Sequence, residues 1–439
     1  MSRRILVLFP DEWDRLAAED PRYRDRFEFL FEGFDLFRFP ENARLFTFDA
    51  LRFVEDLCRR HAGARLDGVV TSDEQFGPFI AALVCERLGL AHTPVRSILT
   101  IQHKYYARQA FQRVAPEANP AFGLLRRDYS RPEDVPLAFP FYVKPAKAAF
   151  SVLARRVDSF EQLRRHTRFG WLEAAIIRGL VRPFGDVMRA HSDLTEHPFS
   201  MVCEEILVGP QVTANGFVRD GKVTMLGIVD SIMYPGTDQF QRFQYPSSLP
   251  PELQSRAEAL AERVLAGVGF RHGMFNVEMR IDPVSGSPRI IEINPRAAGQ
   301  FYDLFERVDG FSLFEALLEL ECGGTPVVSH RKGRDRVAAS FVLRDLAGAG
   351  LSRWPSGREI AALKAANPDA HLMLYPKRGA DLKREMKWLG SYRYGVFNVG
   401  AASVEELFAR FDRLCRAIDF HPRGHRLAVD GLGAAGAAD

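Results

Sequence analysis

Hydrophobic and polar residues alternate along the first part of the chain as they do in a strand–helix–strand fold. Residues 5–9 and 67–71 are short apolar runs typical of buried strands. Residues 49–61 and 76–88 carry apolar side chains at helical spacing, and each segment follows one of these runs. We therefore expect a parallel sheet near the N-terminus, with any ligand lying at the carboxyl ends of its strands.

The pattern changes after the polar, proline-containing segment 126–136. The strands and helices predicted beyond it come in mixed order: strands at 141–144 and 199–204, a helical stretch at about 171–190, a hairpin from 211 to 231, a helix at about 250–265, and strands at 273–281 and 289–293.

A third pattern begins at about residue 331. Strands are predicted near 336–343, 371–375 and 394–399, and helices near 357–366 and 403–418. The glycine- and alanine-rich end, 431–439, is expected to be disordered. We predict three domains, 1–125, 126–330 and 331–430, followed by this tail.

Composition narrows the class of protein. The 439 residues include 59 Lys and Arg against 56 Asp and Glu, a balance too even for a protein whose main partner is nucleic acid. The 35 phenylalanines indicate packed apolar cores. No apolar run approaches the ~20 residues that span a bilayer, and the N-terminal run is too short for a signal peptide. Five cysteines without a CxxC pair indicate neither disulfides nor a thiolate metal site. We expect a cytoplasmic protein with no membrane association.

The strongest candidate chemistry is a pair of glutamates on neighbouring predicted strands, Glu278 and Glu292. Glu292, Asn294 and Arg296 follow one another at every second position, so their side chains point to one side of the sheet. Two carboxylates and an amide oxygen suit Mg²⁺ (or Mn²⁺), which prefers oxygen ligands. A buried structural ion pair between Arg296 and one glutamate is the alternative.

Two lysines and one strand exit are weaker candidates. Lys144 ends an apolar strand, and Lys104 begins a helix; an ammonium at either place suits phosphate oxygens, although solvated lysines are the common case. Residues 204–207 leave a strand through an apolar segment whose main chain could bind an adenine edge. An ordinary strand-to-turn exit is the more common explanation of such a segment.

Taken in order, Lys104, VKPA with Lys144, EEILVGPQ, NVEM with Glu278, and EINPR resemble the ATP-grasp superfamily of carboxylate–amine ligases. That superfamily includes L-amino acid ligases, biotin carboxylase and carbamoyl phosphate synthase, and the resemblance covers about residues 100–325. It implies a mixed α/β and α+β fold. A Rossmann-like pre-ATP-grasp domain would precede a two-subdomain ATP-grasp fold (126–207 and 208–330), and a C-terminal α/β lid would follow.

The resemblance also implies roles for individual residues. Lys104 and Lys144 would contact ATP phosphates, and Arg296 would stabilise an acyl phosphate. The remaining implied sites are the adenine-binding hinge, Glu204, Glu205, Ile206 and Leu207, and the Mg²⁺ ligands, Glu278, Glu292 and Asn294.

The sequence departs from the family pattern at three places. The phosphate loop, usually rich in Gly and Ser, reads AKAAFSVLA, so Lys147 or Ser151 is expected to share phosphate binding. Gln211 stands where many members have the glutamate that holds the ribose hydroxyls. Residues 165–195 form an apparent helical insertion to which the sequence assigns no role; a lid, a partner surface and core filler stay open.

The implied reaction is ATP-dependent formation of an amide or peptide bond through an acyl phosphate, with release of ADP and phosphate. The substrates would be a small carboxylate and an amine, and the C-terminal part, which resembles the lid of L-amino acid ligases, favours amino acids. Arg242 and Tyr245 are candidates for acceptor contacts, with an exposed loop as the alternative. A bicarbonate-using carboxylase or carbamoyl-phosphate-type enzyme and a catalytically silent nucleotide-binding module stay open, as does homo-oligomerisation.

Overall fold

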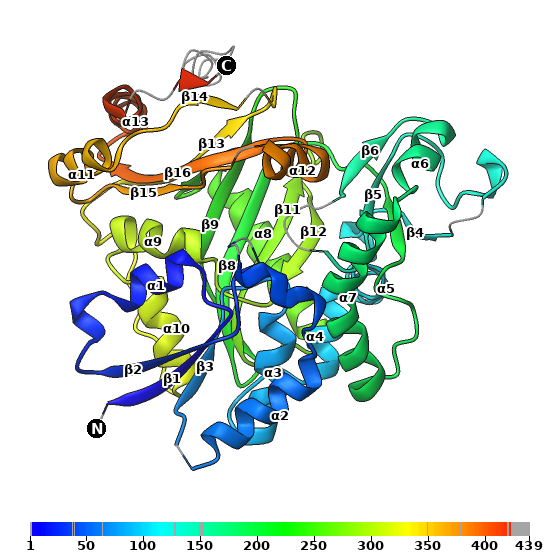
Figure 1. Ribbon diagram of the computed structural model, residues 1–439, viewed down its shortest axis with the longest axis horizontal. Helices are drawn as coiled ribbons and strands as arrows, with labels where there is room; N and C mark the ends of the chain where they lie inside the picture. The colour runs from blue at the N-terminus through cyan, green and yellow to red at the C-terminus, as the bar shows by residue number, and fades with distance from the viewer. Residues whose placement is uncertain are drawn as a thin grey trace. The chain divides into compact units, whose positions relative to one another are not determined.

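The computed structural model describes residues 2–36, 38, 40–63, 65–126, 129–148, 153–348, 350–377, 379–418 and 421–422 (Figure 1). The chain divides into two compact units. One comprises Met1–Ile228, Leu249–Tyr302 and Leu313–Val327, and the other comprises Val229–Ser248, Asp303–Ser312 and Val328–Asp439. The three-domain boundaries near residues 125 and 330 stay predictions, and the predicted disordered tail lies outside the described residues.

The first unit begins with the predicted parallel sheet. Strands β2 (Phe27–Glu32), β1 (Arg3–Leu8) and β3 (Gly68–Val70) pair in that order, all parallel. Helices α2 (Ala50–His61) and α3 (Gly77–Leu88) follow the predicted periodicity. The prediction omitted β2, an edge strand whose sequence FEFLFE interleaves glutamate with phenylalanine.

Local chemistry sets the ends of these helices. The Asp49 carboxylate accepts a hydrogen bond from the main-chain N–H of Arg52 and so caps the start of α2. Helix α3 ends at Gly89, whose φ of +67° is a left-handed conformation that glycine adopts without steric cost. Asp73 accepts from the N–H groups of Phe76 and Gly77 and holds the loop between β3 and α3 in a fixed shape.

Two further sheets complete the first unit. An antiparallel sheet has the order β4 (Phe122–Leu125), β7 (Met201–Glu204), β5 (Phe141–Pro145) and β6 (Arg155–Val157). The other sheet has the order β12 (Pro288–Asn294), β11 (Gly273–Ile281), β8 (Gln211–Arg219) and β9 (Lys222–Met233), the last of which continues into the second unit. The remaining helices that lie wholly in this unit are α1 (Glu12–Ala18), α4 (Val95–Gln102), α5 (Lys104–Val114), α6 (Phe160–His166), α7 (Trp171–His191), α8 (Pro251–Gly267) and α10 (Leu313–Glu321).

A cluster of phenylalanine rings accounts for part of the unusual phenylalanine content. Phe9, Phe34, Phe48 and Phe76 are buried, and each ring lies within 6 Å of the other three. They belong to the apolar core that supports the carboxyl ends of β1 and β3. The loops that leave these strands are therefore carried on a rigid base.

The second unit contains the end of β9 and four further antiparallel strands of the same sheet. Beyond the end of β9, the order is β10 (Phe240–Tyr245), β13 (Val337–Asp345), β16 (Tyr392–Ala401) and β15 (His371–Leu374). Strands β13, β16 and β15 match the predicted ranges within a few residues, as do the helices α11 (Gly357–Ala366) and α13 (Val404–Ile418). Helix α12 (Gly379–Leu389) also belongs to this unit. The sequence did not predict β10, β14 (Leu351–Arg353), β17 (His421–Pro422) or α9 (Tyr302–Asp309), which begins at the last residue of a first-unit segment. Within the described part of the chain, no helix is long and apolar enough to cross a membrane.

Candidate functional site

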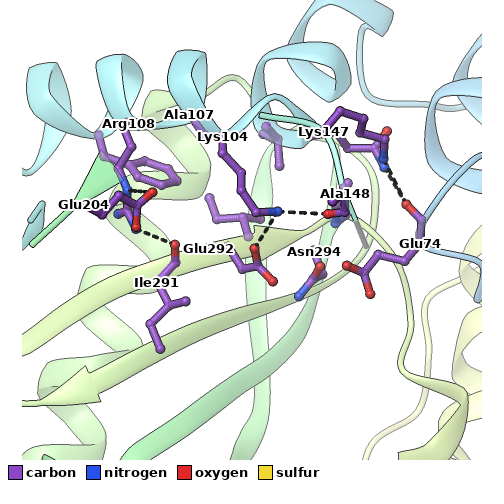
Figure 2. A pocket seen from close by; sticks show the side chains of 15 residues that line it. Glu74, Lys104, Ala107, Arg108, Lys147, Ala148, Glu204, Ile291, Glu292 and Asn294 are labelled. Atoms are coloured by element: carbon purple, nitrogen blue, oxygen red, sulfur yellow. Dashed lines mark hydrogen bonds and ion pairs between the residues drawn. The ribbon is translucent and has the colours of Figure 1, made fainter. Parts of the chain in front are cut away.

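A pocket within the first unit gathers charged residues from several elements (Figure 2). Five of the residues predicted to bind ATP or metal line it: Lys104, Lys147, Glu204, Glu292 and Asn294. The other lining residues are Glu74, Ile101, Gln102, Ala107, Arg108, Phe111, Ala148, Ile291, Ile293 and Pro295.

The two predicted metal-binding glutamates face each other in the sheet. Glu278 on β11 pairs in register with Glu292 on β12, so their side chains are direct cross-strand neighbours. Glu278 accepts hydrogen bonds from Gln211 Nε2 (3.0 Å) and Asn294 Nδ2 (3.1 Å). Burial and the nearby Glu292 carboxylate raise the pKa of Glu278 to about 8. Two half-buried carboxylates placed side by side repel each other, and a cation between them would relieve that repulsion.

Lys104 supplies part of that positive charge. Its Nζ lies 3.1 Å from Glu292 Oε2 and donates to the carbonyl oxygen of Ala148 at 3.0 Å. Burial alone would raise the pKa of Glu292, but the Lys104 and Lys144 ammonium groups outweigh it and hold that pKa below its ordinary value. The Lys104 ammonium thus lies between the carboxylate pair and the end of strand β5.

The oxygen atoms of Glu278, Glu292 and Asn294 suit a metal ion that takes its remaining ligands from water or from a bound substrate. Across the described residues, no group of three or more His, Cys, Asp or Glu side chains is arranged to hold a metal by itself. Two carboxylates with one amide fit Mg²⁺, which usually binds one or two protein carboxylates and takes its other oxygens from water or substrate phosphates. The assignment of Glu278, Glu292 and Asn294 as ligands remains a prediction.

Lys144 takes part in a buried ion network with Glu204 and Arg108. The Glu204 carboxylate lies 2.7 Å from Lys144 Nζ and accepts from Arg108 at 2.9 and 2.7 Å. Arg108 also donates to the carbonyl oxygens of Ile290 and Ile291, both at 2.7 Å. Burial would raise the pKa of Glu204, but Arg108 and Lys144 lower it to about 2. Lys144 is thus engaged by Glu204 and does not line the pocket, although Glu204 and Arg108 do.

The predicted hinge begins at this network. Glu204 ends strand β7, and the N–H of Glu205 donates to the carbonyl oxygen of Ala121 at 2.8 Å. The Glu205 carboxylate accepts from the Ala121 N–H and from Arg289. Ile206 and Leu207 follow as half-buried residues. The glutamates of this segment therefore fix its position, and adenine binding by its main chain stays a prediction.

Arg296 is held by a residue that the sequence did not single out, Glu74. Arg296 Nη2 lies 2.7 Å from Glu74 Oε2, and both side chains are largely buried. Glu74 lies in the loop that follows β3, at the carboxyl end of the parallel sheet. Ligands of parallel sheets bind at the carboxyl ends of the strands, so a check of each residue that follows such a strand would have identified Glu74.

Arg108 is the other residue that sequence reasoning missed. It lies four positions after Lys104 in α5, a spacing that places both cations on one face of the helix. That spacing was a usable signal. Because only Lys104 was considered in this helix, Arg108 and its hydrogen bonds to Glu204 were not predicted.

Lys147 is buried at the end of the pocket opposite Glu204 (Figure 2). Its Nζ donates to the carbonyl oxygen of Glu74 at 3.2 Å and lies 5.3 Å from the centre of the Phe184 ring. Burial and the neighbouring Lys104 lower the pKa of Lys147 to about 7. Ser151, predicted to share phosphate binding, lies outside the described residues.

The two candidate acceptor contacts belong to the second unit. Arg242 donates to the side-chain oxygens of Gln241 (2.9 Å) and Gln244 (3.3 Å). The Tyr245 hydroxyl donates to the Asp309 carboxylate. Substrate contact by either residue stays a prediction.

Comparison with known proteins bears on these assignments. Residues 137–303 match the family model of the ATP-grasp domain. Carnosine synthase 1 of Gallus gallus is 29% identical over 371 residues, which make up 80% of this chain and 37% of that protein. Carnosine synthase 1 of Mus musculus is 36% identical over 178 residues, 39% of this chain and 20% of that protein. The chain thus spans well under half the length of the curated relatives it matches.

Solved structures share the fold across almost the whole chain. The L-amino acid ligase from Bacillus licheniformis superposes with a TM-score of 0.66 at 18% identity, covering 95% of this chain and 98% of that one. A carboxyaminoimidazole ribonucleotide synthase from Aspergillus clavatus, complexed with ATP, gives 0.65 at 16% identity over 95% and 98%. The predicted mixed α/β fold is thereby confirmed. The residues that match the ATP-grasp family model lie within the predicted ATP-grasp region, whose bounds stay a prediction.

Proposed function

We propose that this ATP-grasp protein is an ATP-dependent carboxylate–amine ligase, which forms an amide or peptide bond through an acyl phosphate and releases ADP and phosphate. The observation that carries the proposal is the in-register pair Glu278 and Glu292, with Lys104 on Glu292. Both glutamates lie within the segment that matches the ATP-grasp domain.

The site has the charges that phosphoryl transfer requires. A carboxylate is a poor electrophile at neutral pH, so ATP must first convert it to an acyl phosphate. Lys104 and Lys147 provide ammonium groups for phosphate oxygens at the pocket. Lys144 does not line the pocket and forms an ion pair with Glu204, which does. Glu278, Glu292 and Asn294 would hold Mg²⁺ or Mn²⁺, which neutralises phosphate charge when bound.

Arg296 would stabilise the acyl phosphate and the species formed when the amine attacks it. A guanidinium held by Glu74 at 2.7 Å is already oriented before substrate arrives. Such preorganised charge stabilises a developing anion more than water does. After that attack, the bond to phosphate breaks, and the amide and inorganic phosphate are released.

The nucleotide base and ribose are assigned to the hinge. Residues 204–207 would contact adenine through the main chain, and Gln211 would bond the ribose hydroxyls. Gln211 Nε2 donates to Glu278 in the structure, and the amide oxygen of the same side chain would accept from the ribose hydroxyls.

Amino acids are the substrates we propose, and the cytoplasm is the proposed location. Two of the proteins that this chain resembles are called carnosine synthase 1 and L-amino acid ligase. Both names describe joining of amino acids or their derivatives. We therefore propose amino acids as the substrate class, and the experiment below identifies which two amino acids are joined.

The test is ADP release by the purified chain with MgATP and a panel of amino acids, offered singly and in pairs. We expect ADP to appear only with particular pairs, together with an equal amount of a dipeptide detected by mass spectrometry. ADP release that requires bicarbonate would instead support the carboxylase alternative. ATP binding without ADP release on any pair would overturn the ligase proposal in favour of a silent nucleotide-binding module.

A further inference from the structure

Helix α7 occupies most of the segment 165–195 that the sequence left without a role. It packs against helices α2 and α4 (Figure 1). The Gln75 side chain, from the loop between β3 and α3, donates to the carbonyl oxygen of Leu180 at 2.8 Å. On the same helix, Phe184 and Val187 are completely buried in the core of the first unit.

Phe184 presents the face of its ring to Lys147. The ammonium nitrogen lies 5.3 Å from the ring centre, within the range of a cation–π interaction. The ring itself is fixed by an edge-on contact with Phe79 at 5.5 Å and by a stacked contact with His103 at 6.4 Å. It is therefore a rigid support for the lysine.

Lys147 has few other interactions to compensate its burial. Only 3% of its surface is exposed, and within the described part of the chain its ammonium makes no ion pair at 4 Å or less. The main-chain N–H of Lys147 donates to the carbonyl oxygen of Pro198, and its Nζ donates to that of Glu74. The charged or titratable groups around it are Lys104, Asp73, Glu74, Glu292 and His103. A buried cation with one carbonyl acceptor and one aromatic face has donor capacity left for an anion.

We propose that Phe184 is a positioning residue for Lys147, through which helix α7 holds the lysine ammonium ready for the phosphate groups of ATP. The proposal rests on the proposed function, because it assumes that ATP binds at this pocket. It assigns the inserted helix a role in nucleotide binding. Phe184 acts through Lys147 and does not itself touch the nucleotide.

A double-mutant cycle tests this role. ATP binding is measured by titration calorimetry in the presence of Mg²⁺ for the wild type, Phe184→Leu, Lys147→Met and the double variant. We expect Phe184→Leu to weaken ATP binding about 5- to 10-fold, as loss of a desolvated cation–π contact would. In the Lys147→Met background the same change should have little effect, because the interaction is already absent.

Val187→Ala is the matched control, since Val187 is as buried as Phe184 on the same helix. It should lower the unfolding temperature while leaving ATP affinity within about twofold of wild type. An equal loss of ATP affinity on Phe184→Leu with and without Lys147 would overturn the proposal, as would wild-type affinity in Phe184→Leu. A wild-type chain that binds no ATP would instead refute the proposed function itself.

Discussion

Glu74 and Arg296 form an ion pair at 2.7 Å although they lie 222 positions apart in the chain. Glu74 follows the parallel strand β3, and Arg296 follows strand β12 of the sheet that carries the glutamate pair. The Glu74 carboxylate binds the guanidinium, while its carbonyl oxygen accepts from Lys147 and Gln102. One residue of the N-terminal α/β segment thus orients two cations of the site.

Glu74→Gln should slow turnover more than it weakens ATP binding. The substitution removes the negative charge that orients Arg296 and leaves a largely buried guanidinium without its counterion. Loss of such a supporting partner typically costs about 10- to 100-fold in activity. We expect kcat for ADP release to fall by that factor, with ATP affinity by calorimetry within about threefold of wild type.

Exposed Glu262 on helix α8 provides the control for charge alone. Glu262→Gln makes the same chemical change and should leave kcat unaltered. A wild-type kcat in Glu74→Gln would show that Arg296 is oriented without Glu74.

Glu292→Ala should abolish turnover and the dependence of ATP binding on Mg²⁺. The variant removes one of the two proposed carboxylate ligands and leaves Lys104 without its ion-pair partner. Wild-type protein should bind ATP at least about tenfold more tightly with Mg²⁺ than with EDTA, and the variant should show no such difference. Calorimetric titration of ATP into each protein, with and without metal, measures it. Full activity in Glu292→Ala would contradict the metal assignment.

The sequence predicted the motif-bearing strands well because their signals are local. The strands that carry Glu278 and Glu292 are apolar runs joined by a turn, which predicts an antiparallel hairpin. The hairpin alone does not set the two glutamates opposite each other, because Glu278 meets Glu292 through a register shift between Glu278 and Met279. The β8–β9 hairpin was equally clear, because an Asp-Gly pair favours a tight turn in which both residues have positive φ. Asp220 and Gly221 adopt positive φ in the structure.

The supporting residues could not be read in the same way. Arg108 contacts Glu204 across 96 positions, and Glu74 contacts Arg296 across 222. The four-residue spacing from Lys104 marks Arg108 as a second cation, and the position after β3 marks Glu74, but neither signal identifies the distant partner, because each pairing depends on how separate elements pack. The role of Phe184 is a third case, since an apolar residue in an amphipathic helix looks the same whether it faces the core or a lysine.

Arg242→Met should raise the KM for an amino-acid substrate while leaving the KM for ATP unchanged. The described hydrogen-bond partners of the Arg242 guanidinium are the neutral side chains of Gln241 and Gln244, and it lies over the ring of Phe408. The Asp230 carboxylate lies near enough to favour the charged guanidinium, but no ion pair at 4 Å or less joins these two described side chains, so the cation keeps hydrogen-bonding capacity for an anionic ligand such as a substrate carboxylate. We expect an increase of about tenfold or more in the steady-state KM, consistent with loss of a charge-assisted hydrogen bond. An increase confined to the KM for ATP would contradict this role.

Glu204→Gln should destabilise the protein most strongly near neutral pH. The ionised carboxylate compensates two buried cations, Arg108 and Lys144, so its loss should lower the free energy of unfolding by about 3–5 kcal/mol. Those cations, acting against burial, lower the pKa of Glu204 from 4.5 to about 2 in the folded state. The stability that ionisation contributes is therefore complete above pH 4.5 and is lost as the pH falls towards 2.

The difference in unfolding free energy between wild type and Glu204→Gln should consequently be constant from about pH 7 to 5 and shrink below pH 4.5. Below pH 4.5 the wild type begins to lose the stability that the ionised Glu204 carboxylate provides, and the variant lacks this stability at every pH. Urea unfolding followed by circular dichroism at a series of pH values measures this difference. The Glu262→Gln variant, compared with wild type in the same way, should show no comparable pH-dependent change. A Glu204→Gln difference that stays level down to about pH 3 would mean that the carboxylate does not carry its charge in this network.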